Sequence, residues 1–277
     1  MTSGTRPEQH IIHQHANDKE IKGLGVHMNF FGTFEYHAMQ MRAKFDAMAR
    51  RLRQSNLSST LSRKFYDTFY LPSVMYSLPV TSLPDSSLHR IQSLMTATIL
   101  NKLGYNRHYP HAAAFAPISI FGCGLRDLKV EQGLQQIQAV LDYVGTHHRI
   151  GELILISLRH LQVEAGVSFD ILQNPHTPIP HLTDCWVLYL RRFCDRHSIS
   201  LKLQGNRVPS VCRAQDRLLM DAALTLGLTK RELIDLNLVR SFLGATTVSD
   251  IATADGQAFH PSSWKGLPIP PHSRRWI

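Results

Sequence analysis

Apolar residues recur along this chain mostly at helical spacing. The clearest stripe alternates steps of four and three and predicts a long amphipathic helix over residues 34–52. Similar stripes predict helices over residues 58–71, 88–103, 130–144, 153–163, 186–193, 218–222 and 229–242. The members of the first stripe are Phe34, Ala38, Met41, Phe45, Met48 and Leu52.

Polar residues in front of these stripes indicate where several helices begin and end. Asn56 and Ser58 are candidate caps of the second helix, and we expect Pro72 to end it, because the residue before a proline disfavours helical geometry. Thr183 is the candidate cap of the helix over residues 186–193. Thr229 and Glu232 have the spacing of a capping box.

Two short segments have the pattern of strands. The glycines at 23, 25 and 32 punctuate the first, so we predict a small β-hairpin with its strands between residues 24 and 34. Ile199, Leu201 and Leu203 alternate and predict a lone strand. The expected fold class is therefore mainly α, a multi-helix bundle with a small N-terminal β-hairpin and a second helical region.

The same pattern divides the chain into segments. We expect a flexible lead-in over residues 1–21, a hairpin over 22–34 and a helical bundle over 35–104. A connector over 105–124 contains prolines and glycines, and a C-terminal helical region follows over 125–260. Residues 261–277 contain four prolines and are expected to form a disordered tail that is truncated after Trp276 and Ile277.

Composition narrows the classes of partner. The 277 residues have a formal net charge of +9 and a pI near 9.6, which favours a polyanionic partner such as nucleic acid. No apolar run approaches the ~20 residues that span a bilayer, so we expect no membrane partner. The four cysteines include no Cys-x-x-Cys pair, and we expect reduced thiols in an intracellular protein, nuclear or cytoplasmic.

The strongest candidate for binding is a basic segment in and after the first helix. Seven basic residues stand there against the single acid Asp46, and most project away from the apolar stripe. Such a face suits the phosphate backbone of a nucleic acid, although a merely solvated helix face has the same pattern. Tyr66, Tyr70 and Tyr76 could stack on bases or belong to the core. The seven basic residues are Arg42, Lys44, Arg50, Arg51, Arg53, Arg63 and Lys64.

Patterns that carry catalysis are missing from the sequence. No two aspartates stand side by side, and there is no glycine-rich phosphate loop, Gly-x-Ser-x-Gly elbow or His-Glu-x-x-His motif. His10, His13 and His15 lack partnering cysteines or carboxylates in a metal-binding pattern. We therefore predict no catalytic residue, no metal site and no cofactor.

Several motifs in order resemble one protein family. Lys22-Gly23-Leu24-Gly25-Val26, the basic helix, Tyr66 to Tyr76 around Pro72, and Leu88-x-x-Ile91-Gln92 are similar to the palm-to-thumb passage of non-LTR retrotransposon reverse transcriptases. Later stretches look like the post-thumb region of such elements in diatoms and other protists. These stretches are Leu125-x-x-Leu128-x-Val130-Glu131-Gln132-Gly133, Leu161-Gln162-Val163-Glu164-Ala165-Gly166 and Thr246-Thr247-Val248-Ser249-Asp250-Ile251.

The resemblance implies a specific function. Residues 22–34 would be the remnant of a palm hairpin, with Lys22, Gly23, Leu24 and Gly25 near the primer end, and residues 35–104 a thumb that cradles an RNA–DNA or DNA template–primer duplex. The catalytic aspartates of an RNA-directed DNA polymerase would belong to a missing palm half, so the chain alone should be inactive. Two alternatives remain, a helical protein-interaction module and an element remnant with no retained activity.

Overall fold

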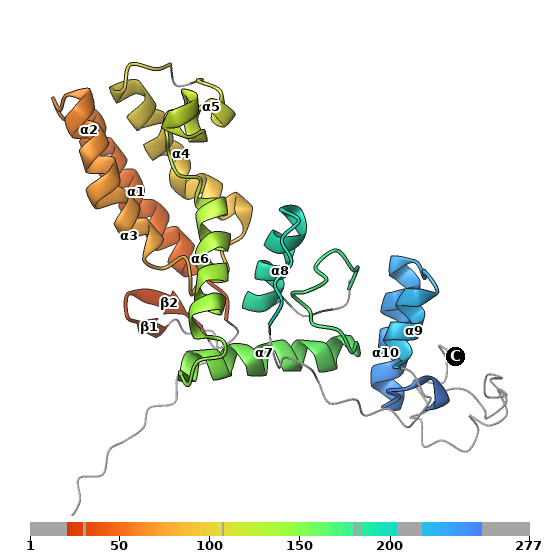
Figure 1. Ribbon diagram of the computed structural model, residues 1–277. Coiled ribbons are helices and arrows are strands. Elements are labelled where there is room, and N and C mark those ends of the chain that lie inside the picture. Colours follow the sequence, from red (N-terminus) through yellow and green to blue (C-terminus); the bar gives the residue numbers. More distant parts are fainter. Residues whose placement is uncertain are drawn as a thin grey trace, which may run out of the picture. The chain divides into compact units, whose positions relative to one another are not determined.

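The computed structural model describes residues 21–29, 32–106, 108–179, 182, 184–203 and 218–250 (Figure 1). It confirms a mainly helical fold with a small two-stranded antiparallel hairpin. Two compact units divide between Gln138 and Ala139, inside helix α6 (Leu128–Tyr143). The predicted lead-in, apart from Ile21, and the predicted tail lie outside the described residues. None of the described helices combines the length and apolar character that crossing a membrane requires.

The hairpin lies earlier in the chain than predicted. Strand β1 (Ile21–Gly23) pairs with β2 (Val26–Met28), and Gly23 faces Val26 across the turn. The expectation of strands between residues 24 and 34 was wrong, because Leu24 and Gly25 both have positive φ angles, 49° and 86°, and form the two-residue turn itself. Leucine rarely adopts this conformation, so its position gave no turn signal.

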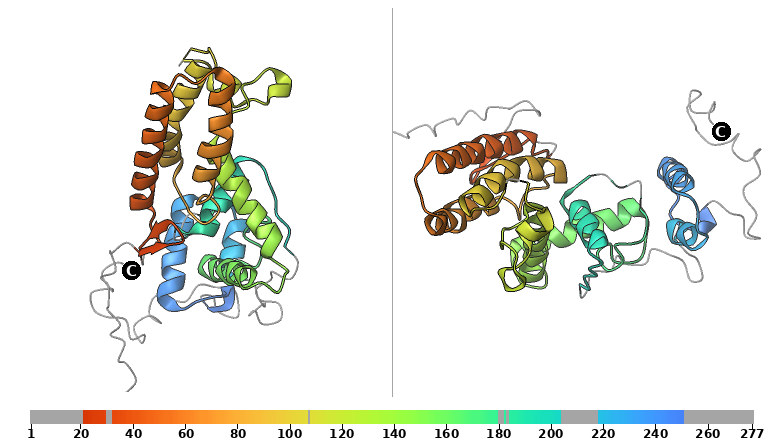
Figure 2. Two further views of the ribbon diagram at one scale, coloured as in Figure 1. Left: turned by 90° about the vertical axis from the view of Figure 1, so that its left-hand side faces the viewer. Right: turned by 90° about the horizontal axis from the view of Figure 1, so that it is seen from above.

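Unit 1 is built around two parallel helices, α1 (Glu35–Gln54) and α4 (Asp85–Lys102), which lie side by side (Figures 1 and 2). The predicted stripe of α1 is confirmed, with Phe45 and Leu52 almost fully buried. At the C-terminal ends of both helices the Lys102 ammonium donates to the Ser55 carbonyl over 2.5 Å. The buried apolar residues of α4 are Leu88, Ile91, Met95, Ile99 and Leu100.

The second predicted helix does not end at Pro72. Helix α2 (Ser59–Phe65) is capped by Ser58, one of the two predicted candidates, and continues through a π-helical turn (Tyr66–Tyr70) into α3 (Leu71–Met75) (Figure 1). The Leu71 N–H reaches back to the Tyr66 carbonyl, so the hydrogen-bond register shifts by one residue just before the proline. Pro72 then falls in the first turn of α3, where its missing N–H is tolerated.

The connector after α4 is more ordered than an irregular loop. It contains helix α5 (His111–Phe115) and one 3₁₀ turn (Ile118–Ile120), and its end folds back on α5 through hydrogen bonds such as Gly124 N–H to the Ala116 carbonyl. A Cβ on Gly122 would lie 2.1 Å from that same carbonyl oxygen. Only glycine therefore fits at 122, and the return of the chain toward α6 depends on it.

Helix α6 turns a different face inward from the one its apolar residues predict. Leu134 and Leu141 of the predicted stripe are 46% and 57% exposed, whereas Gln132 and Gln136 are buried. Both glutamines bond to the backbone of the segment before α4. Gln132 pairs with both the N–H and the carbonyl of Leu83, and Gln136 donates to the Thr81 carbonyl. These bonds act beside the buried apolar side chains of Leu128 and Val140, so the inward face of α6 is partly polar.

Unit 2 contains the remaining helices α7 (Arg149–Ala165), α8 (Trp186–Arg196), α9 (Leu219–Thr225) and α10 (Lys230–Leu243) and a 3₁₀ turn (Val248–Asp250). The Thr229 and Glu232 capping box at the start of α10 is confirmed. The candidate cap Thr183 lies outside the described residues. The prediction of a lone strand over 199–203 was wrong, because this segment forms no ladder. Its Ile199 N–H bonds to the Cys194 carbonyl and its Leu201 N–H to the Leu172 carbonyl.

Candidate nucleic-acid interface

Helix α1 presents a row of exposed basic side chains. Its buried face is fixed by the stripe that contains Phe45 and Leu52, and the basic residues occupy the remaining positions of the helix. Two of them, Arg51 and Arg53, stand in the last turn, where positive charge interacts favourably with the helix dipole. The exposed basic residues of α1 are Arg42, Lys44, Arg50, Arg51 and Arg53.

These side chains divide between two flanks of α1. Arg42 and Arg53 are about three turns apart and share one flank, toward which Arg50 also points. Lys44 and Arg51 are about two turns apart and share the other flank. The cations therefore form two stripes rather than one continuous face.

Few acidic groups neutralise these charges. Among the described residues, the one ion pair of α1 joins Arg42 and Asp46 with a nitrogen–oxygen distance of 3.8 Å, longer than a hydrogen bond. Lys44 lies over the Phe45 ring at 5.3 Å. Within the described part of the chain, Arg50 and Arg53 have no polar side-chain partner. Their guanidinium groups are available for anionic oxygens.

A groove with a volume of about 360 Å³ lies between the N-terminal halves of α1 and α4. Arg42 stands on its α1 side, and Ser87 and Arg90 stand on its α4 side. Sequence reasoning missed Arg90 because it is a single cation on a polar helix face, and only the parallel packing of α1 and α4 brings it near Arg42. The groove belongs to the same flank of α1 as Arg50 and Arg53.

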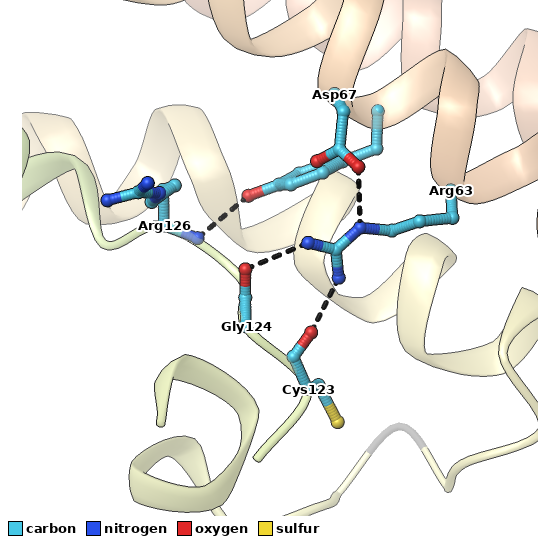
Figure 3. Close-up of polar contacts among 6 residues, drawn as sticks. Arg63, Asp67, Cys123, Gly124 and Arg126 are labelled. Atoms are coloured by element: carbon cyan, nitrogen blue, oxygen red, sulfur yellow. Dashed lines mark hydrogen bonds and ion pairs between the residues drawn. The ribbon is translucent and has the colours of Figure 1, made fainter. Parts of the chain in front are cut away.

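The two basic candidates outside α1 differ from each other. Lys64 on α2 is exposed to solvent. The Arg63 guanidinium instead bonds to three groups (Figure 3), the Asp67 carboxylate at 2.7 Å and the carbonyls of Cys123 and Gly124 at 2.5 and 3.0 Å. Arg63 thus fastens α2 to the end of the connector, a role that its position in the basic segment did not indicate.

A neighbouring bond strengthens the same junction. The Arg126 backbone N–H donates to the Tyr66 hydroxyl over 3.1 Å (Figure 3). Burial raises the pKa of Tyr66 to about 12. The Tyr70 ring packs edge-on against Phe45, and burial raises the pKa of Tyr70 as well. Tyr66 and Tyr70 are therefore core residues and do not offer rings for stacking on bases.

The predicted primer hairpin is exposed at all four candidate residues, Lys22, Gly23, Leu24 and Gly25. Leu24 at the turn is 91% exposed. The exposed side chain of Tyr76 reaches this turn, where its hydroxyl donates to the Leu24 carbonyl over 3.0 Å. The bond fixes the tip of the hairpin to the end of α3.

Two histidines join the hairpin to α1. The backbone N–H of His27 donates to Nδ1 of His37 over 3.3 Å, and His37 is only 4% exposed. Burial, and secondarily the neighbouring His27, lower the pKa of His37. Because Nδ1 accepts this bond, the proton of the neutral His37 ring lies on Nε2, an atom with no hydrogen-bond partner among the described residues.

Single aspartates of the sequence serve structural bonds where the structure describes them. Asp127 accepts from Gln92, and Asp221 accepts from the Ser168 N–H. Asp250 accepts from the N–H groups of Thr246 and Thr247. Among the described residues, no three histidine, cysteine or acidic side chains gather closely enough to hold a metal ion.

Unit 2 contains a second groove, of about 410 Å³, between α8 and the start of α10. His176 and Asp195 line it and lie 2.6 Å apart, and both are more than half exposed. The buried Arg191 beneath it donates to the carbonyls of Ile171 and Thr177. Arg191 thereby holds the loop before α8 in place. None of the predicted binding residues lines this groove.

No protein-family model matches this chain, and neither does any curated protein or solved structure.

Proposed function

We propose that this protein binds a template–primer nucleic-acid duplex through the exposed basic residues of α1 and Lys64 of α2, without sequence preference. In this proposal the chain is a non-catalytic, thumb-like part of a retrotransposon RNA-directed DNA polymerase. The support for that identity is the order of the motifs from Lys22 to Tyr76, and no chemistry is assigned to the chain alone.

The proposal rests on one observation. Five arginines and lysines of one helix are exposed, and only Arg42 has a carboxylate partner in the described part of the chain, at a distance that leaves it open to exchange. Helix α1 is anchored along its whole buried face, so these cations are held on a rigid support. Successive phosphates can exchange their counterions for such a row of charges.

The proposal predicts a uniform decrease of affinity in the variant Arg50→Ala/Arg51→Ala/Arg53→Ala. All three side chains are exposed, so the helix should persist. The affinity for an RNA–DNA hybrid should fall equally for unrelated sequences, and the slope of log K against log salt should flatten by about 0.9 for each phosphate that the variant no longer neutralises. Fluorescence anisotropy across a salt series measures both quantities.

A control variant removes the same charge from unit 2. Arg159, Lys202 and Lys230 are exposed, and changing all three to alanine lowers the net charge of the protein equally. Binding that depends only on net charge would weaken to the same extent in both variants. The proposal requires the α1 variant to weaken more, and equal weakening would overturn the assignment to α1.

An exposed apolar face favours the second candidate function, a helical protein-interaction module. On α7 the side chains of Leu153, Ile156 and Val163 are 55%, 60% and 63% exposed. Such a face is common where a partner protein docks. Capture of partners on the immobilised chain, with and without nuclease, separates the two candidates, because a protein partner survives nuclease treatment and a nucleic-acid bridge does not.

A further inference from the structure

The groove between α1 and α4 has the features of a phosphate site. Its floor includes Ala38 and Ile91, which are 8% and 1% exposed, and Arg42 and Arg90 stand on opposite helices above it. Tight packing of α1 against α4 fixes the two helices, and so the two arginine backbones, relative to each other. The helix backbones on both sides of the groove therefore need no rearrangement when an anion binds, although the arginine side chains must still be ordered.

The groove has a positive charge that the fold does not neutralise. Arg90 is exposed and its guanidinium has no partner in the described part of the chain. Arg42 has only the long contact to Asp46. Glu35 also lines the groove, so two cations and one anion leave it with net positive charge. The Ser87 hydroxyl on the α4 side adds a neutral hydrogen-bond donor.

The groove also continues the stripe of cations on α1. Arg50 follows Arg42 by about 12 Å along the helix axis, and Arg53 by about 16 Å, on the same flank. Lys44 and Arg51 face the other flank. A backbone that follows this flank therefore meets Arg90 of α4 at one end and Arg53 of α1 at the other.

We propose that the groove seats one phosphate of a nucleic-acid backbone between Arg42 and Arg90, with Ser87 donating to a phosphate oxygen. This inference rests on the proposed function and specifies the path of the strand, along the α4-facing flank of α1. It adds two residues of α4 to the interface, and it makes Lys44 and Arg51 the lesser contacts.

The test compares Arg90→Ala with Arg159→Ala in the full chain. Each variant removes one exposed positive charge, but only Arg90 lines the groove. For an RNA–DNA hybrid, Arg90→Ala should weaken binding about fivefold and flatten the salt slope by about 0.9. Arg159→Ala, in unit 2, should change the affinity by less than about twofold.

A second variant uses the same groove without removing an arginine. Ser87→Asp places a negative charge in the first turn of α4, where the helix dipole favours it, so the fold should be retained. This variant should weaken binding more than Arg90→Ala does, because it repels the phosphate.

The outcomes separate the groove from the proposed function. If the wild type binds in a salt-dependent way and both Arg90→Ala and Ser87→Asp keep its affinity, the groove does not seat a phosphate. Duplex binding by α1 is not affected by that result. If the wild type does not bind the hybrid at low salt, both the phosphate site in the groove and duplex binding by α1 are overturned. Weaker binding in the two groove variants, with full affinity in Arg159→Ala, supports the path along α4.

Discussion

Arg63 shows that a basic residue in a basic segment can belong to the fold rather than to the interface. Its guanidinium satisfies two backbone carbonyls and one carboxylate at once (Figure 3). Lysine cannot reproduce this fork, because an ammonium group is a point charge with a different donor geometry. Its neighbour Lys64 has the same sign of charge and is exposed to solvent.

We predict that Arg63→Lys lowers the free energy of unfolding by about 2 kcal/mol, because the carbonyls of Cys123 and Gly124 lose their donors. Lys64→Ala should change it by less than about 0.5 kcal/mol. Urea denaturation followed by circular dichroism measures both. A phosphate-binding role for Arg63 would give the reverse pattern, with stability kept in Arg63→Lys and only affinity changed.

His37 makes the attachment of the hairpin sensitive to pH. Its pKa lies below the value of about 6.5 that it has in an unfolded chain, so between these two values the unfolded state binds more protons. The contribution of His37 to the free energy of unfolding is therefore fully present above about pH 6.5 and falls as the pH drops below it. Protonation of Nδ1 also removes the acceptor of the His27 N–H.

We predict that His37→Asn reduces this acid sensitivity, because the asparagine oxygen can accept from the His27 N–H but does not titrate in this range. The urea midpoint of the wild type should fall more between pH 7.5 and 5.5 than the midpoint of the variant. The readout is this pH dependence and not the absolute stability, because the smaller asparagine side chain also fills the buried position less completely. An equal decrease of the urea midpoint in the wild type and the variant would show that protonation of His37 does not weaken the attachment of the hairpin.

At the scale of elements, the helices that the sequence predicts well are those whose apolar face meets an apolar core. The buried stripe of α1 is confirmed because Phe45 and Leu52 meet the hydrophobic side chains of α4. The prediction that the helix ends at Pro72 was wrong, because a π-helical turn places this proline in the first turn of α3, where its missing N–H is tolerated. The predicted buried face of α6 was wrong, because Gln132 is buried and bonds to Leu83. Hydrophobic periodicity does not predict such a polar contact.

Some residues of the candidate interface could be predicted from the sequence and others could not. Exposure of Arg42 and Arg50 follows from the helical period of α1 and was predictable from the sequence. The fixed role of Arg63 was not, because its carbonyl partners come from the distant connector. The position of Arg90 beside Arg42 requires the parallel packing of α1 and α4, which no local pattern contains.

The inward-facing glutamines of α6 lead to a paired prediction. Gln132→Leu should lower the free energy of unfolding by about 2 to 3 kcal/mol, because the buried N–H and carbonyl of Leu83 both lose their partners. Leu134→Gln, on the exposed side of the same helix, should change it by less than about 0.5 kcal/mol. If the apolar stripe were the buried one, the glutamine at 134 would be the destabilising change. Chemical denaturation of the two variants decides between these orientations.

At the scale of the whole molecule, the cations that we propose to contact phosphates belong to unit 1. The exposed cations of α1, together with Lys64 and Arg90, all precede the division between Gln138 and Ala139. Unit 2 contributes the exposed apolar face of α7 and the groove beside α8. Unit 1 thus contains the cations of the proposed interface, and unit 2 contains the apolar face that favours the second candidate function.

The most direct test of duplex binding is the affinity of the full chain for two RNA–DNA hybrids of unrelated sequence between about 50 and about 200 mM salt. Binding through the cations of unit 1 predicts equal affinities for the two hybrids. It also predicts a log K that falls linearly with log salt, with a slope of about −3 to −5 for a handful of phosphate contacts. Absence of binding at the lowest salt, or an affinity that does not change with salt, would contradict duplex binding by this chain.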